Sequence, residues 1–169
     1  MKRSFFILLF FVCNTNLWAQ KNPTCLIKTE LGNIVVELYP SKAPVTVANF
    51  LKYVDAHLYD SSSFFRAVTL NNQPKDSIKI EVIQGGDVDS VKEFASIPLE
   101  TTDKTGVLHK DGTISMARGK PATATSSFFI CINDQPELDH GGKRNRDGQG
   151  FAAFGKVIRG MDVVKKIQW

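Results

Sequence analysis

The sequence is poor in the residues on which most enzymes base their chemistry. It holds three cysteines and three histidines in 169 residues, and no two cysteines form a CxxC pair, which argues against a thioredoxin-type or cysteine-based zinc site. His57, His109 and His140 are too far apart for an HExxH motif. Ser126 and Ser127 are adjacent but lie outside a GxSxG elbow, so a serine nucleophile is not indicated. We therefore expect an activity that needs no metal and no cofactor.

Charge and hydropathy exclude further classes of protein. The 21 basic and 17 acidic side chains give a formal net charge of +4, and no basic stripe with interleaved aromatic residues indicates a nucleic-acid partner. The longest apolar run, residues 5–12, is too short to cross a bilayer, so we expect no stable membrane span. The length is that of one domain with a substantial core.

The first twenty residues, MKRSFFILLFFVCNTNLWAQ, differ from the rest of the chain. A basic start, an apolar stretch and a small-residue end are typical of a secretory signal peptide. We predict a signal peptide over residues 1–19, cleaved after Ala19, and a folded domain over residues 24–169. Cys13 offers a lipoprotein alternative, but the FFV before it lacks the small residues of such a site. The protein is thus predicted to be exported and periplasmic, with secreted or lipid-anchored forms as alternatives, and to be a monomer.

Hydrophobic periodicity predicts a mostly β protein. A helix is expected over residues 43–58, capped by Ser41, and a second helix after Gly160. Cys25 and Cys131 fall on separate predicted strands, where they form either one disulfide or, as we expect, two small buried side chains. Many short strands, two helices and frequent glycine turns favour a barrel or sandwich. The inward face of the first helix is assigned to Val47, Phe50, Leu51, Val54 and Leu58. The expected strands are a hairpin over 25–40, then 63–68, 78–84, 112–117, 127–132 and 150–157.

An arginine inside an apolar strand, Arg66 in SFFRAV, needs an acceptor on the protein or on a ligand. Together with the ordered motifs IQGGD, GTISMA, SSFFICI, LD and FAAFGKVIRGMDVV, it resembles the cyclophilin family of peptidyl-prolyl cis-trans isomerases. The resemblance is strongest to the exported bacterial branch, which carries a segment similar to GGKRN-DGQGFAAFG. It implies an eight-stranded β barrel closed by two helices. The final family strand, which pairs with the first, has no counterpart after GMDVV, so we expect either a truncated product or another segment over that edge.

The implied reaction fits a chain without a nucleophile. Rotation about a peptide bond meets a barrier of about 18–20 kcal/mol, and the twisted transition state has a pyramidal, basic prolyl nitrogen. A donor aimed at this nitrogen stabilises the transition state and not the planar ground state. The resemblance implies that Arg66 is this donor, that Gln84 holds it, and that Phe129 is the floor of the proline pocket. It further implies substrate contacts for Val82, Ala117 and Leu138. It also implies them for three positions where this chain departs from the family: Arg118, Ser127 and Phe151, which replaces the family's active-site histidine.

These departures concern the rim of the pocket. Glu81 and Glu137 replace apolar family residues, Arg118 replaces an asparagine, and we expect Arg118 to be a charge on the rim. The loop TLNNQPKDSI is longer than usual and GGKRNRDGQG is an insertion. The expected partners are proline-containing segments of exported proteins. The alternative is a module of the same fold that binds such segments, as a holdase, without catalysing their isomerisation.

Overall fold

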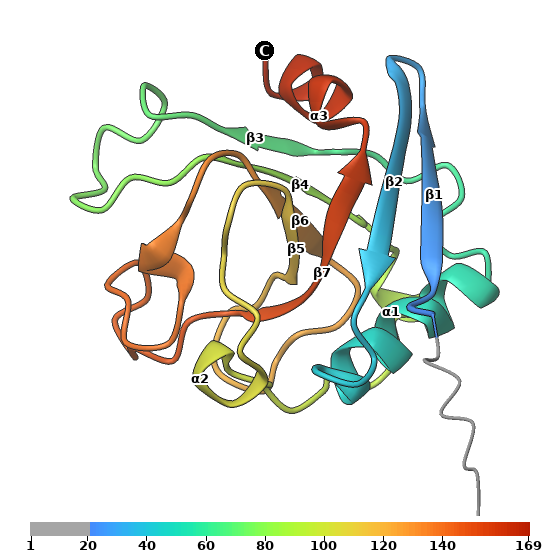
Figure 1. Cartoon of the computed structure of the whole chain (residues 1–169), viewed down its shortest axis with the longest axis horizontal. Coiled ribbons are helices and arrows are strands. Elements are labelled where there is room, and N and C mark those ends of the chain that lie inside the picture. The colour runs from blue at the N-terminus through green and yellow to red at the C-terminus, as the bar shows by residue number, and fades with distance from the viewer. Residues whose placement is uncertain (1–20) are drawn as a thin grey trace, which may run out of the picture.

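One antiparallel sheet of seven strands curls into a half-barrel, with the strand order β1-β2-β7-β5-β6-β4-β3 (Figure 1). The computed structural model describes residues 21–169, so the predicted signal peptide over 1–19 lies outside the described residues. The mostly β class predicted from the sequence is confirmed. The strands are β1 (Thr24–Thr29), β2 (Gly32–Leu38), β3 (Arg66–Val68), β4 (Val82–Gly85), β5 (Thr113–Met116), β6 (Phe128–Cys131) and β7 (Ala152–Arg159).

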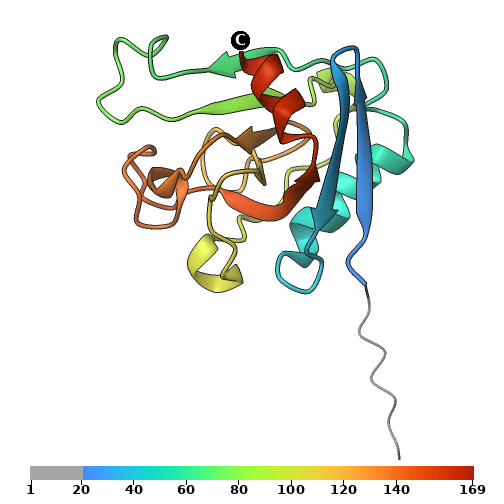
Figure 2. The same cartoon turned by 45° about the horizontal axis from the view of Figure 1, so that its top comes forward.

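Three α-helices accompany the sheet, one more than expected, because a single turn forms between β4 and β5. They are α1 (Pro44–Asp55), α2 (Thr102–Thr105) and α3 (Met161–Gln168), and two 3-10 turns, η1 (Ser90–Lys92) and η2 (Pro136–Leu138), lie in the loops. Helix α3 packs against β2, β3 and β4 (Figure 2), and Gln168 Nε2 donates to the Val68 carbonyl at 2.9 Å. It therefore connects β2, next to one end of the strand order, with β4 and β3 at the other end. Among residues 21–169 there is no helix long and apolar enough to cross a membrane.

The start of α1 differs from the prediction. Ser41 does not cap the helix; Ala43 is at the cap position and Pro44 fixes the first turn. The free backbone N–H of Thr46 instead donates to the Glu100 carboxylate at 2.8 Å. The helix also ends at Asp55, before the predicted end at residue 58.

The sheet has apolar side chains on both faces where β4 and β6 pair. On β6, Phe128 and Ile130 face the main core with Phe50 of α1. Phe129 and Cys131 alternate with them and point to the opposite face, where a second apolar cluster forms. This outer cluster consists of Val68, Ile80, Val82, Phe129, Cys131 and Leu138, with Ala117 and Phe151 packed against it.

The two described cysteines lie in different clusters. Cys25 on β1 packs against the main core, Cys131 on β6 is buried in the outer cluster, and both are free. The expectation of two unlinked cysteines is confirmed and the disulfide alternative is wrong, but only Cys131 is buried as expected, whereas Cys25 is half-buried. Burial raises the pKa of both thiols, most strongly that of Cys131, so both are protonated at neutral pH.

Candidate active site

Strand register places the three predicted catalytic residues side by side. Arg66 on β3 is directly opposite Gln84 on β4, and Gln84 is directly opposite Phe129 on β6. Directly opposed residues share a face of an antiparallel sheet, so all three side chains point to the outer face. Arg66 Nη1 donates to Gln84 Oε1 at 3.2 Å. The guanidinium is thereby held at Gln84, whose neighbour on the next strand is Phe129, while Arg66 itself remains exposed.

The outer cluster supplies the apolar part of the candidate site. Phe129 and Phe151 meet edge to face, with their ring centroids 5.2 Å apart and their planes at 85°, a favoured aromatic geometry. Val82, Ala117 and Leu138 belong to the same cluster. The structure therefore brings together the predicted floor and wall residues.

A buried histidine, whose role the sequence did not show, packs behind this floor. His109 stacks on Phe129 with centroids 5.9 Å apart and planes at 14°. Its Nδ1 lies 2.7 Å from Asp139 Oδ1, and its Nε2 lies 2.9 Å from Ser115 Oγ. The Asp–His–Ser order is that of a hydrolase triad, but Ser115 is 0% exposed and no substrate reaches it. These two hydrogen bonds instead hold the imidazole ring of His109 in place behind Phe129.

Arg118 is not the rim charge that we expected, because its side chain is only 1% exposed. Nη1 and Nη2 bind the Asp147 carboxylate at 2.8 and 2.9 Å, and Nε donates to the Gly150 carbonyl at 2.8 Å. The guanidinium carbon also lies 5.2 Å from the centre of the Phe151 ring. The sequence could not show this pairing because Asp147 lies in the insertion. The arginine holds the segment before Phe151 rather than facing solvent.

The charge of Asp147 depends on this contact. Hydrogen bonds from Arg118, and then the backbone N–H of Gln149, lower the pKa of Asp147 to about 2. Both interactions favour the ionised carboxylate. Arg118 and Asp147 thus form a permanent ion pair at neutral pH, here called the clamp.

The other residues that differ from the family also form hydrogen bonds within the protein. Ser127 is half-buried, and its Oγ lies 3.5 Å from the Gly86 carbonyl. Glu81 accepts from Asn133 Nδ2 at 2.9 Å, and Glu137 accepts from the Lys143 N–H at 2.8 Å. These side chains organise turns around the outer cluster.

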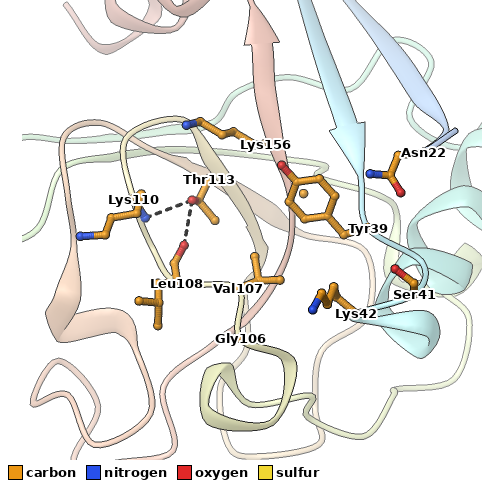
Figure 3. A pocket seen from close by; sticks show the side chains of 11 residues that line it. Asn22, Tyr39, Ser41, Lys42, Gly106, Val107, Leu108, Lys110, Thr113 and Lys156 are labelled. Atoms are coloured by element: carbon orange, nitrogen blue, oxygen red, sulfur yellow. Dashed lines mark hydrogen bonds between the residues drawn. The ribbon is translucent and has the colours of Figure 1, made fainter. Parts of the chain in front are cut away.

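A cavity of about 440 Å³ lies elsewhere, beside the end of β2 and the middle of β7 (Figure 3). Tyr39, Lys42, Lys110 and Lys156 are among its lining residues. None of the outer-cluster residues lines it, so the cavity and the aromatic site are separate. Within residues 21–169 there is no group of three or more side chains able to hold a metal ion.

Comparison with known proteins identifies the class to which this fold and site belong. Residues 24–169 match the family model of the cyclophilin type peptidyl-prolyl cis-trans isomerase/CLD. The chain belongs to this family, and the predicted family and enzyme class are confirmed.

Curated bacterial relatives carry the same activity in their names. A peptidyl-prolyl cis-trans isomerase of Acinetobacter baylyi is 40% identical over 152 residues, which cover 88% of this chain and 73% of the relative. Peptidyl-prolyl cis-trans isomerase A of Dickeya dadantii is 39% identical over 145 residues, covering 84% and 69%. A solved structure, a cyclophilin-type isomerase of Cryptosporidium parvum with the dipeptide Ala-Pro, matches with a TM-score of 0.67 and 25% identity over 86% of this chain and 85% of its own.

Proposed function

We propose that Arg66 catalyses rotation about Xaa-Pro bonds by donating a hydrogen bond to the prolyl nitrogen in the twisted transition state. The observation that carries this proposal is the Arg66–Gln84 hydrogen bond beside Phe129. A guanidinium has five N–H donors in a fixed plane, and Gln84 accepts from one of them. The others remain free to reach a substrate, because Arg66 is exposed.

The proline ring lies, in this proposal, against Phe129 between Val82, Leu138 and Phe151. Of these four, Phe151 is partly exposed, and Phe129, Val82 and Leu138 form the largely buried apolar layer beside it. The Ala-Pro dipeptide present with the C. parvum cyclophilin supports a proline peptide as the ligand. Ala117 and Ser127, whose backbones are joined by an N–H to carbonyl bond of 2.8 Å, flank the residue before the proline.

Catalysis follows from unequal binding of two states. In the planar ground state the prolyl nitrogen has no lone pair to offer, so the donor gains nothing there. In the twisted state the lone pair is localised and accepts the hydrogen bond. The hydrogen bond therefore stabilises the transition state but not the ground state, and the barrier falls. Removing one such donor costs roughly 100–1,000-fold in rate.

The proposal is tested by NMR exchange measurements on an Ala-Pro peptide with the domain over residues 24–169. We expect Arg66→Ala to lower kcat/KM by roughly 100-fold, and Arg66→Lys to restore only part of it, because an ammonium is a point charge without the planar fork. Arg159→Ala, at an exposed arginine at the end of β7, is the matched control and should keep full activity. An unchanged rate in Arg66→Ala would refute the mechanism, and peptide binding without exchange would favour the holdase alternative.

We further propose that the protein acts on proline-containing segments of exported proteins in the periplasm. The support is the basic start, apolar run and small-residue end of residues 1–19. Fractionation of cells that express the full chain with a C-terminal tag tests this: we expect the processed protein in the periplasmic fraction. Unprocessed protein in the cytoplasmic fraction would contradict it.

A further inference from the structure

Two loops surround the outer cluster, and each connects residues of the candidate active site. Loop 69–81 runs from β3, which carries Arg66, to β4, which carries Gln84. Loop 139–150 runs from Leu138 to Phe151. The two loops lie on the same flank of the molecule in both views (Figures 1 and 2). A substrate bound beside Phe129 therefore extends past one or both of them.

An arginine joins the two loops. Arg144 in the second loop donates through Nη1 to the Ile78 carbonyl in the first, and its Nη2 lies 3.2 Å from Asp76 Oδ2. Its side chain is 13% exposed, so this contact is largely shielded from water. The loops thus form one continuous wall rather than two independent flaps.

Each loop is also fixed to the body of the domain. The buried Gln73 side chain donates to the carbonyls of Thr69 and Ile80 at 2.7 and 2.8 Å, which closes the first loop at its base. The clamp of Arg118 and Asp147 fixes the second. Such preorganisation reduces the entropy lost when a ligand binds.

The wall carries several exposed basic side chains that form no ion pair within residues 21–169. Two of its four acidic residues are paired with arginines, Asp76 with Arg144 and Asp147 with Arg118. The other two, Asp139 and Glu81, accept hydrogen bonds from His109 and Asn133. Four exposed basic side chains remain, here called the basic wall: Lys75, Lys79, Lys143 and Arg146. In the part of the chain that the structure describes, none of these four has an ion-pair partner.

We propose that the basic wall selects substrates with acidic residues beside the proline. This inference rests on the proposed isomerase function and adds the substrate class to it. Aspartate or glutamate in an extended segment next to the proline would meet the basic wall together with the positively charged Arg66. Two exposed ion pairs, at the energies usual for a protein surface, raise kcat/KM roughly 3–10-fold.

The test compares three peptides with Ala-Pro-Ala at the centre, flanked on both sides by two aspartates, two glutamines or two lysines. Catalysed exchange is measured by NMR at 50 and 200 mM salt. We expect kcat/KM in the order aspartate, glutamine, lysine, and a smaller spread at 200 mM salt, because salt screens exposed charges. Equal kcat/KM for the three peptides at both salt concentrations would overturn the proposal and leave the isomerase function standing.

Charge reversal of the basic wall gives the second arm. Lys75→Glu, Lys79→Glu, Lys143→Glu and Arg146→Glu together should invert the order of the charged peptides while the rate on the glutamine peptide stays unchanged. The control reverses four exposed lysines on other elements, Lys28, Lys42, Lys104 and Lys165, and should keep the original order. A control that inverts the order equally would refute a local basic wall.

The failure of the proposed function looks different. If no peptide is turned over, the isomerase proposal fails, and chemical-shift titration of the same peptides then gives their Kd values. The lowest Kd for the aspartate peptide would still support substrate selection by the basic wall. Equal Kd values for the three peptides would overturn it.

Discussion

Arg118 and Asp147 meet through two parallel hydrogen bonds, Nη1 to Oδ2 at 2.8 Å and Nη2 to Oδ1 at 2.9 Å. This bidentate geometry joins the segment after β5 to the insertion that leads into Phe151. Because the guanidinium also binds the Gly150 carbonyl and lies over the Phe151 ring, the clamp sets where that ring stands. The position of one wall of the candidate proline pocket therefore depends on an ion pair outside it.

Breaking the clamp should weaken substrate binding more than the chemical step. Asp147→Asn keeps the shape but removes the charge, so the buried guanidinium loses its counter-ion and Phe151 loses its fixed position. We expect kcat/KM to fall roughly 10-fold, mainly through KM, since small displacements of positioning groups have effects of this order. Steady-state exchange kinetics check this, with Asp134→Asn, which removes an exposed partner of Lys110, as the control. A fall confined to kcat would contradict a positioning role.

The same pair predicts how acid affects stability. The pKa of Asp147 in the folded protein is about 2, below the ordinary value of 3.8, so the folded state favours the ionised form. The resulting stabilisation is complete above about pH 4 and is lost as the pH falls through 2. We expect the Tm difference between the parent protein and Asp147→Asn to be constant from pH 5 to 7 and to shrink below pH 4. A difference that persists at pH 2 would mean that the carboxylate charge is not what stabilises the loop.

Local patterns predicted the elements well, because strands and helices bury one face at a fixed period. Val47 and Phe50 are buried on α1 as the spacing indicated. The candidate site was named through its resemblance to a family rather than through periodicity. Strand register then explains why Arg66, Gln84 and Phe129, far apart in the sequence, are neighbours.

The errors share a physical cause, which is pairing between distant residues. Ser41 has the right side chain for a helix cap, but the N–H of Thr46 in the first turn donates to Glu100, which lies 54 residues further along the chain. Arg118 was placed on the rim because its acceptor Asp147 lies 29 residues away in an inserted loop. A polar residue's partner determines whether it is buried, and a linear pattern does not contain that partner.

The structural role of His109 predicts what its removal does to stability. Its replacement by alanine opens a cavity behind Phe129, removes the side-chain partner of Ser115 and leaves Asp139 Oδ1 with only the backbone N–H of residue 109. We expect a loss of about 2–4 kcal/mol in the free energy of unfolding, from the cavity and the unpaired polar groups together, and a raised KM. Urea unfolding at neutral pH measures it. His140→Ala, at an exposed histidine, should lose little, and equal losses in both variants would contradict a specific role for His109.

Two glycines in the insertion provide a matched test of close packing beneath the clamp. Gly150 and Gly148 have nearly the same left-handed backbone, with φ of +65° and +63°, so alanine at either position costs about 1–2 kcal/mol of backbone strain. Their surroundings differ. A Cβ at Gly150 would lie 2.5 Å from the carbonyl carbon of Asp139 and 2.6 Å from the Leu138 oxygen, whereas a Cβ at Gly148 would have nothing within 4 Å.

Gly150→Ala must therefore displace backbone at the base of the pocket, including the carbonyl that Arg118 binds. We expect it to destabilise the domain by roughly 3 kcal/mol or more, in the range reserved for buried steric conflicts, and to lower kcat/KM with it. Gly148→Ala should show the backbone strain alone and keep its activity. Equal unfolding free energies for the two variants would show that the insertion moves freely against Leu138 and Asp139, and the clamp could not then be what positions Phe151.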